Sequence, residues 1–372
     1  MKRILEINNQ HILNEISISK NLLYKRITCN ELLHLKNWIL VFFDLLEKKL
    51  RHNLYLISVC ASDSYPNIYN NTQIYSSLLR LCTQRFVPPI VRYNNDDKLC
   101  LKLLNWLHRE HPEIGDKPFA IDDADFAIYP DKNFPLIYFL PSTSQRTLLH
   151  LPLFFHELGH YLYILHREEM DNLVKSLQEN LKEFLIIPYE HNDKKYSEKL
   201  NKAKLIIARW YRWIQEIFCD LIGLKIGGAC FIHAFSLYLR TSGRASFYQE
   251  EDKLLTSTHP VPWLRVKFLA AYANDYGLEN EANLLSNEWK LIASSLGIKE
   301  QFFGFYQNIY FDDFKFILND MIEESGAISF KNYINQDNFI NTLNVAWKKF
   351  EESPDSYYNW EKCFIENIIK QH

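Results

Sequence analysis

Residues 156–160 read His-Glu-Leu-Gly-His and stand in an apolar stretch with helical periodicity. Positions four apart share one face of a helix, so the imidazoles of His156 and His160 can reach the same ion. Glu157 is rotated by about 100° from His156, which brings its carboxylate beside that ion. There it can accept a proton from a zinc-bound water. The pattern therefore predicts a catalytic zinc site, and the alternative is a hydrogen-bonded core cluster on an amphipathic helix.

Three residues stand at spacings that would suit a third ligand. His166 occupies the place of a third histidine, but the glycine that would let the chain leave the helix is replaced by Tyr163. A continuing helix carries His166 about 9 Å beyond His160, so we reject it. Glu179 is a weaker alternative, because residues 161–187 contain no glycine or proline and a straight helix would place Glu179 about 28 Å away.

Glu216 is the preferred third ligand. The polar segment 188–199 allows the chain to reverse, so an apolar helix over about 202–226 can pack antiparallel to the helix of the motif. Glu216 and Asp220 are four apart and share a face of that helix. One carboxylate can bind zinc while the other accepts the remaining N–H of a ligating histidine. The alternatives are a buried structural ion pair and an exposed carboxylate pair.

A third element follows in the order of a known family. HELGH, then Glu216 and Asp220 in E-x-x-x-D, then T-H-P-x-x-x-x-R resembles the gluzincin family of CAAX prenyl endopeptidases and bacterial heat-shock membrane metalloproteases over about residues 136–275. The resemblance implies Glu216 as zinc ligand and Asp220 as its outer partner. It also implies that His259 stabilises the oxyanion of the tetrahedral intermediate and that Arg265 supports the loop or pairs with an acidic residue. Both belong to the third element, which also contains Thr258 and Pro260.

The chain departs from that family in two ways. It has no apolar stretch long enough to span a bilayer, whereas such family members are usually embedded in a membrane. Cys219 stands where the family's E-x-x-A-D has alanine. The substrate class, prenylated proteins in particular, is therefore not carried over.

The periodicity of the whole chain predicts an α+β, predominantly helical fold. We expect a zincin-like metallopeptidase core with a small sheet, flanked by N- and C-terminal helical lobes. Helices are expected at about 31–58, 97–110, 144–187, 202–226, 229–240 and 262–276, and strands around a turn within 126–141, with 136–140 the stronger. The expected regions are 1–115 (helical), 116–276 (metallopeptidase core) and 277–372 (helical).

Composition limits the class of protein. Apolar residues make up 47% of 372 residues, which is the composition of a globular chain. The formal charge of −3 comes without a long basic block, so we expect no nucleic-acid partner and no membrane insertion. No signal peptide is expected, and seven scattered cysteines without C-x-x-C favour free thiols and a cytoplasmic location.

Three functions remain in competition. The first is a zinc endopeptidase acting on protein or peptide substrates, narrow in specificity and regulated by a stimulus or a protein partner. The second is another zinc amidohydrolase, such as a deformylase, although Cys100 lacks the glycines of the deformylase motif. The third is a catalytically silent interaction protein with a zincin fold. The intact Glu157 argues against the third, because a structural zinc site gains little from a general base.

Overall fold

The fold is described from a computed structural model. It describes residues 1–26, 29–93, 97–115, 118–122, 125–129, 134–141, 143–186, 196–333 and 339–370. The chain is predominantly helical with one small three-stranded sheet, which confirms the expected secondary-structure class. It forms two compact units. The first holds 1–105, 116–125 and 131–145, and the second holds 106–115, 126–130 and 146–372. The expected division into three regions stays a prediction.

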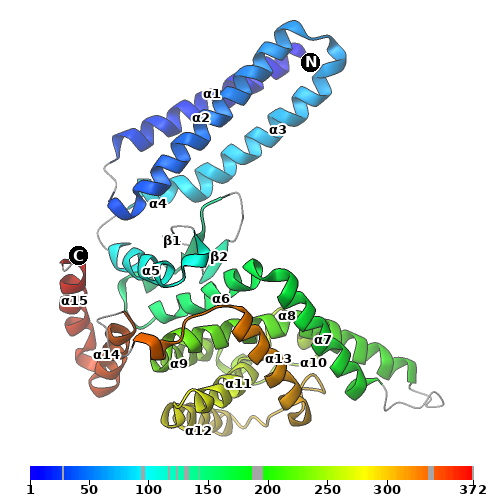
Figure 1. The fold of residues 1–372 in the computed structure, drawn as a ribbon, viewed down its shortest axis with the longest axis vertical. Coiled ribbons are helices and arrows are strands. Elements are labelled where there is room, and N and C mark those ends of the chain that lie inside the picture. The colour runs from blue at the N-terminus through cyan, green and yellow to red at the C-terminus, as the bar shows by residue number, and fades with distance from the viewer. Residues whose placement is uncertain are drawn as a thin grey trace. The chain divides into compact units, whose positions relative to one another are not determined.

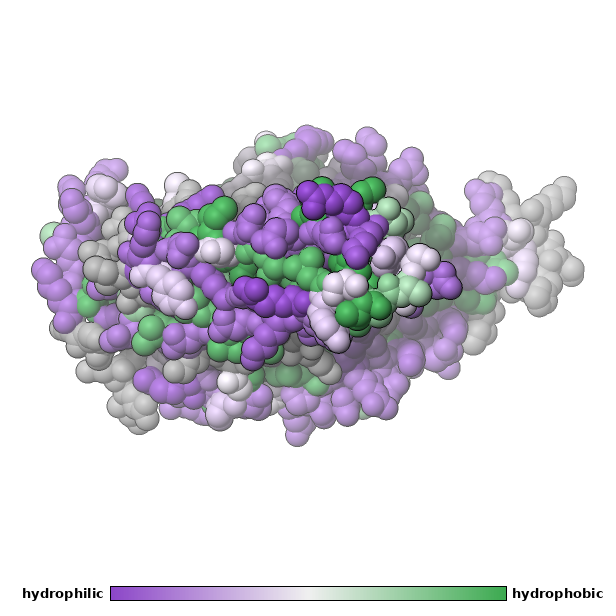
Figure 2. Space-filling model, turned by 90° about the horizontal axis from the view of Figure 1, so that it is seen from above, coloured by the Kyte–Doolittle hydropathy of each residue, from purple (hydrophilic) through white to green (hydrophobic). Residues whose placement is uncertain are grey.

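Three long helices build most of the first unit (Figure 1). α1 (Lys2–Lys25), α2 (Asn30–Val59) and α3 (Tyr65–Leu81) all pack against one another. Leu35, Ile39, Phe43, Leu46 and Leu50 of α2 are buried at helical spacing, which explains why the periodicity of 31–58 predicted this helix. Each helix also carries exposed apolar residues, and hydrophobic and hydrophilic side chains are interspersed on the face shown in Figure 2.

The sheet contributes two parallel strands to this unit. β1 (Phe119–Asp122) pairs with β3 (Ile137–Leu140) in the register Phe119 to Ile137. All four residues of β3 are buried, as a continuous apolar run predicts for a strand covered on both faces. The strand expected at 136–140 is thus confirmed. Residues 130–133 of the expected turn lie outside the described residues.

The second unit is organised around one long buried helix. α8 (Tyr196–Gly227) lies beside α6 (Phe154–Leu165) and also packs on α7, α9, α11 and α13 (Figure 1). Its residues from Trp213 to Leu224 are almost all buried, so polar residues in that span sit in the core of the unit. α8 ends at Gly227, and Gly228 has a positive φ of 56° before α9 (Ala229–Leu239), a backbone conformation that glycine adopts without steric cost.

Two expectations about helices are wrong. The continuous helix expected over 144–187 is instead α6, which begins only at Phe154, and α7 (Arg167–Leu185), separated at His166 with φ −104° and ψ 33°. No glycine or proline is needed there, because one residue outside helical geometry interrupts the hydrogen-bond ladder. Short 3-10 helices at Ser144–Arg146 and Leu151–Leu153 precede α6. Between the helices expected at 229–240 and 262–276, where no helix was expected, the chain forms a short 3-10 helix at Arg240–Ser246 and α10 (Glu251–Thr256).

Further helices complete both units. α5 (Lys98–Glu110) and α11 (Pro262–Asp275) match the predicted ranges closely. None of the helices within the described residues is long and apolar enough to cross a membrane. The remaining helices and the third strand are α4 (Val87–Val91), α12 (Glu279–Ser295), α13 (Phe311–Glu324), α14 (Phe339–Glu352), α15 (Pro354–Lys370) and β2 (Ala127–Tyr129).

Candidate metal centre

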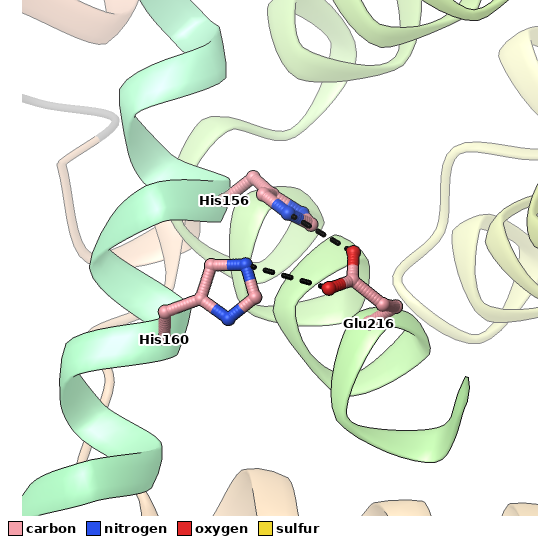
Figure 3. Close-up of side chains that lie close together, drawn as sticks. All are labelled: His156, His160 and Glu216. Atoms are coloured by element: carbon pink, nitrogen blue, oxygen red, sulfur yellow. Dashed lines mark ion pairs between the residues drawn. The ribbon is translucent and has the colours of Figure 1, made fainter. Parts of the chain in front are cut away.

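The two motif histidines and Glu216 face one another across the α6–α8 pair (Figure 3). Nε2 of His156 lies 3.7 Å from Oε2 of Glu216, and Nε2 of His160 lies 3.7 Å from Oε1. The two imidazoles are nearly perpendicular, at 86° with centroids 4.9 Å apart, so their Nε2 atoms converge from two directions. Among the described residues, these three side chains are the one group of three or more potential ligands close enough together to hold a metal ion.

The spacing of these atoms fits a small cation better than direct hydrogen bonds. A separation of 3.7 Å is too long for an N–H···O bond. Tetrahedral zinc with bonds of about 2.0–2.1 Å would hold its ligand atoms roughly 3.3 Å apart. A small inward movement of the three side chains would therefore close the site on an ion. The residues fit a divalent metal in ligand type, number and spacing.

Asp220 stands behind His156. Its Oδ1 lies 2.9 Å from Nδ1 of His156, although the N–H is not aligned for a linear hydrogen bond. Both side chains are almost completely buried at this contact. Burial opposes protonation of His156, but Asp220 outweighs it and raises the pKa of the imidazole. A carboxylate that accepts the proton on Nδ1 leaves the lone pair on Nε2, which faces Glu216, and makes that nitrogen more basic than it would be without the carboxylate.

Arg265 closes the network from α11. It donates Nε–H to Oδ2 of Asp220 at 2.8 Å and Nη2–H to Oδ1 at 2.6 Å, a bidentate pair. The same Nη2 lies 3.5 Å from Oε2 of Glu216, and the guanidinium stacks over Phe235 at 4.8 Å. Burial would raise the pKa of Asp220, but Arg265 outweighs it, so the pKa is lowered and Asp220 is ionised.

The charges in this buried cluster do not balance by themselves. Glu157, Glu216 and Asp220 are buried together with Arg265. Burial would raise the pKa of Glu216, but Arg265 and the histidines outweigh it and lower the pKa. Burial, reinforced by His156, lowers the pKa of His160 to about 4, so this imidazole is neutral near pH 7. With both imidazoles neutral, as metal ligands are, three carboxylates beside one guanidinium give a formal excess of two negative charges, which a divalent cation would neutralise.

His259 lies at the open side of the cluster. Its Nε2 is 3.4 Å from Oε1 of Glu216, and its side chain is 57% exposed. Nδ1 lies 2.9 Å from the hydroxyl of Thr258, and the carbonyl of His259 accepts a hydrogen bond from Ser257 at 2.6 Å. Burial of part of the ring lowers the pKa of His259, with Glu216 opposing. The loop thus presents a neutral imidazole to the open side of the cluster.

The residues singled out in the sequence occupy different places. His156, Glu157, His160, Glu216, Asp220, His259 and Arg265 all belong to one cluster. Glu179 lies on α7 and pairs with Lys182 at 2.6 Å, with 69% of its side chain exposed. His166 lies 3.6 Å from Glu324. The sequence reasoning missed Phe235, which stacks on His156 and lies under Arg265, because an aromatic residue in an apolar helix carries no functional signal.

It also undervalued Cys219 and Gly159. A Cβ on Gly159 would lie 2.8 Å from Cα of Cys219, so only glycine lets the two helices approach at that point. The signals that could have found them were the glycine inside HELGH and the cysteine in place of alanine. No protein-family model, no curated protein and no solved structure matches this chain. The functional argument therefore rests on the geometry of the cluster and on the motifs that build it.

Proposed function

We propose that this chain is a zinc-dependent peptidase with a zincin-like core, and that His156, His160 and Glu216 hold the metal. The observation that carries the proposal is the convergence of two imidazole Nε2 atoms and one buried carboxylate in a cluster with excess negative charge. The resemblance to the CAAX prenyl endopeptidase and heat-shock metalloprotease family supports it further. Its three motif elements, far apart in the sequence, meet in the second unit.

Each residue has a defined task in this proposal. A zinc ion held here would supply Lewis acidity, which polarises a carbonyl and brings the pKa of a water near 7. Glu157 takes the proton of the attacking water and delivers it to the leaving amine, as a general base and then acid. His259, at the open side, donates its N–H to the oxyanion of the tetrahedral intermediate. Asp220 orients His156, and Arg265 holds Asp220 in its ionised form.

The setting of the protein is also part of the proposal. All seven cysteines are free, which supports a reducing compartment such as the cytoplasm. A peptidase in that compartment would have to be narrow in specificity or kept inactive until needed. We therefore propose regulation by a protein partner or a stimulus. Purified protein that degrades an unfolded substrate such as casein without any activator would contradict this regulation while leaving the peptidase assignment intact.

The decisive experiment compares the wild type with Glu157→Gln. Zinc content is measured for both, and both are screened against a peptide library with zinc present. We expect equal zinc content and a loss of about 10²–10⁴-fold in kcat/KM, the usual contribution of a positioned general base. Glu169→Gln, an exposed change on α7, is the matched control and should keep full activity.

The other outcomes of this experiment assign the competing functions. A wild type that holds zinc and hydrolyses small amides but no peptides would be a different zinc amidohydrolase. A wild type that holds zinc with no hydrolase activity in any condition would be an interaction protein. A wild type that binds no divalent metal would overturn the metal site itself.

A further inference from the structure

A different residue of α8 contacts the Nδ1 atom of each motif histidine. Both Nε2 atoms face Glu216, while Nδ1 of His156 faces Asp220. Nδ1 of His160 lies 3.3 Å from Sγ of Cys219. Residues 216, 219 and 220 share one face of the helix, since positions three and four apart are neighbours on its surface. α8 therefore presents a shared carboxylate for the two Nε2 atoms and a separate partner behind each ring.

The contact of Cys219 depends on the close crossing of the two helices. Gly159 precedes His160, and a Cβ there would meet Cα, Cβ and Sγ of Cys219 at 2.8, 3.1 and 3.2 Å. Without a side chain at position 159, α6 comes close enough for the sulfur to reach the adjacent imidazole. Cys219 is completely buried, so water does not take the place of this partner.

The chemistry of a ligating imidazole gives the sulfur its task. A neutral imidazole that binds a metal through Nε2 carries its proton on Nδ1 and needs an acceptor for it. A thiol sulfur is a weak acceptor. His160 therefore has a weaker partner than His156, whose Nδ1 faces an ionised carboxylate.

On the basis of the proposed function, we propose that Cys219 is a positioning residue for His160. Its sulfur accepts the Nδ1–H of His160, which fixes the tautomer with a free Nε2 lone pair and holds the ring toward Glu216. The sulfur does not join the ligand set, because it contacts the nitrogen on the side of the ring away from Glu216. It acts on the metal only through the orientation of His160.

The test uses Cys219→Ala, Cys219→Ser and a matched control, Cys230→Ala. Cys230 is equally buried in the same unit, and its thiol donates to the carbonyl of Gly227 at 3.1 Å, so its loss also removes one buried sulfur. Zinc affinity is measured by competition with a chromophoric chelator. We expect about a 10-fold weaker affinity for Cys219→Ala, the lower end of the range for outer partners of metal ligands. Cys219→Ser keeps an acceptor on the same Cβ and should recover most of the loss, and Cys230→Ala should bind as the wild type does.

A second readout separates orientation from folding. Nitrogen-15 NMR of histidine-labelled, zinc-loaded protein reports which ring nitrogen of His160 carries the proton. The wild type and Cys219→Ser should show a protonated Nδ1 with its proton protected from exchange, and in Cys219→Ala that protection should be lost. If the wild type binds zinc through Glu216 but Cys219→Ala changes neither the zinc affinity nor the proton exchange, this inference is overturned and the proposed function stands. A wild type without zinc affinity would overturn the proposed function together with it.

Discussion

Both units of the chain contain a polar cluster buried between helices, and these two clusters differ in how their polar groups are satisfied. In the first unit, Asn9, Asn53 and Thr72 join α1, α2 and α3, and all three residues are neutral. In the second, the cluster around Glu216 joins α6, α8 and α11 and carries excess negative charge. Both lie in apolar surroundings, where an unpaired polar group is costly.

The neutral cluster closes on itself. Asn9 donates to the carbonyl of Leu5 at 2.8 Å and to Thr72 at 3.0 Å, and Thr72 donates to the carbonyl of Ile68 at 2.8 Å. Asn53 donates to Asn9 and to Thr72, both at 3.3 Å. Donors and acceptors are matched within the unit, so the cluster specifies how the helices pack and requires no ligand.

In the charged cluster, close hydrogen bonds join only the residues that lie behind the candidate ligands. Asp220 and Arg265 pair closely, whereas the ligand atoms of His156, His160 and Glu216 face one another at distances that suit an ion. The comparison teaches that burial of polar residues alone does not indicate a functional site. Unmatched acceptors that converge on one point, together with unbalanced charge, are the more specific sign.

Replacement of Glu216, the third ligand, should have the largest effect on zinc binding. Zinc sites with about four ligands bind with apparent energies of about 10–16 kcal/mol, so Glu216→Ala should weaken zinc binding by at least about 100-fold. Zinc at 100 times its Kd should stabilise the wild type by about 2.7 kcal/mol, and the variant should lose this stabilisation. Thermal unfolding with and without zinc measures both effects.

Glu179→Ala is the matched control for that change. Glu179 was the alternative third ligand in the sequence and is an exposed residue of α7 in the structure. This variant should bind zinc as the wild type does. Loss of zinc binding in Glu179→Ala but not in Glu216→Ala would reverse the assignment of the ligand.

Arg265 provides the next prediction, which concerns stability without metal. Arg265→Met leaves Asp220 buried without its charged partner, and removing one partner of a buried ion pair costs about 3–5 kcal/mol. The exposed pair of Lys202 and Glu251 is the control, and Lys202→Met should cost about 0–1 kcal/mol. Denaturant unfolding in the presence of a chelator measures both. Equal losses in the two variants would show that the buried pair contributes no more than a surface pair.

A smaller effect is expected in the neutral cluster. Thr72→Val keeps the shape of the side chain but removes the hydroxyl that serves Asn9 and Asn53, at a cost of about 1–3 kcal/mol. Zinc affinity should not change, since the cluster belongs to the other unit. Thr83→Val is the control, because the Thr83 hydroxyl bonds to backbone carbonyls of the preceding turn, those of Leu79 and Arg80. A change in zinc affinity in Thr72→Val would contradict the separation of the two roles.

The sequence predicted which residues form the candidate metal cluster better than it predicted the helices around that cluster. The four-residue spacings of His156 with His160, and of Glu216 with Asp220, fix which side chains share a helix face whatever the tertiary structure. The break at His166 was not predictable in this way, because it involves neither glycine nor proline. The contact of Cys219 with His160 depends on how two helices cross, which no local pattern records. The neutral cluster was missed because asparagine and threonine within helices are read as surface residues.

The smallest predicted effect concerns His111, a buried histidine of the second unit that resembles the neutral cluster in its bonding. Its Nδ1–H donates to the carbonyl of Leu107 at 2.9 Å, and its Nε2 accepts the N–H of Ile328 at 3.1 Å. Both ring nitrogens are satisfied, so zinc should not bind here although the residue is a histidine. Burial lowers the pKa of His111 below its usual value, which means that the folded state resists protonation.

The sign of the pH dependence follows from that direction. Between the lowered folded pKa and the unfolded value of about 6.5, the unfolded chain binds more protons than the folded one. The contribution of His111 to stability is therefore complete above about pH 6.5 and declines as the pH falls below it, by at most about 1.4 kcal/mol for each unit of the pKa shift. In a chelator, the unfolding free energy of wild type should decrease more between pH 7.5 and 5.5 than that of His111→Gln, since the other histidines are common to both. Equal pH dependence in the two proteins would mean that His111 titrates alike in the folded and unfolded chains, and that two satisfied ring nitrogens do not suffice to keep a buried histidine neutral.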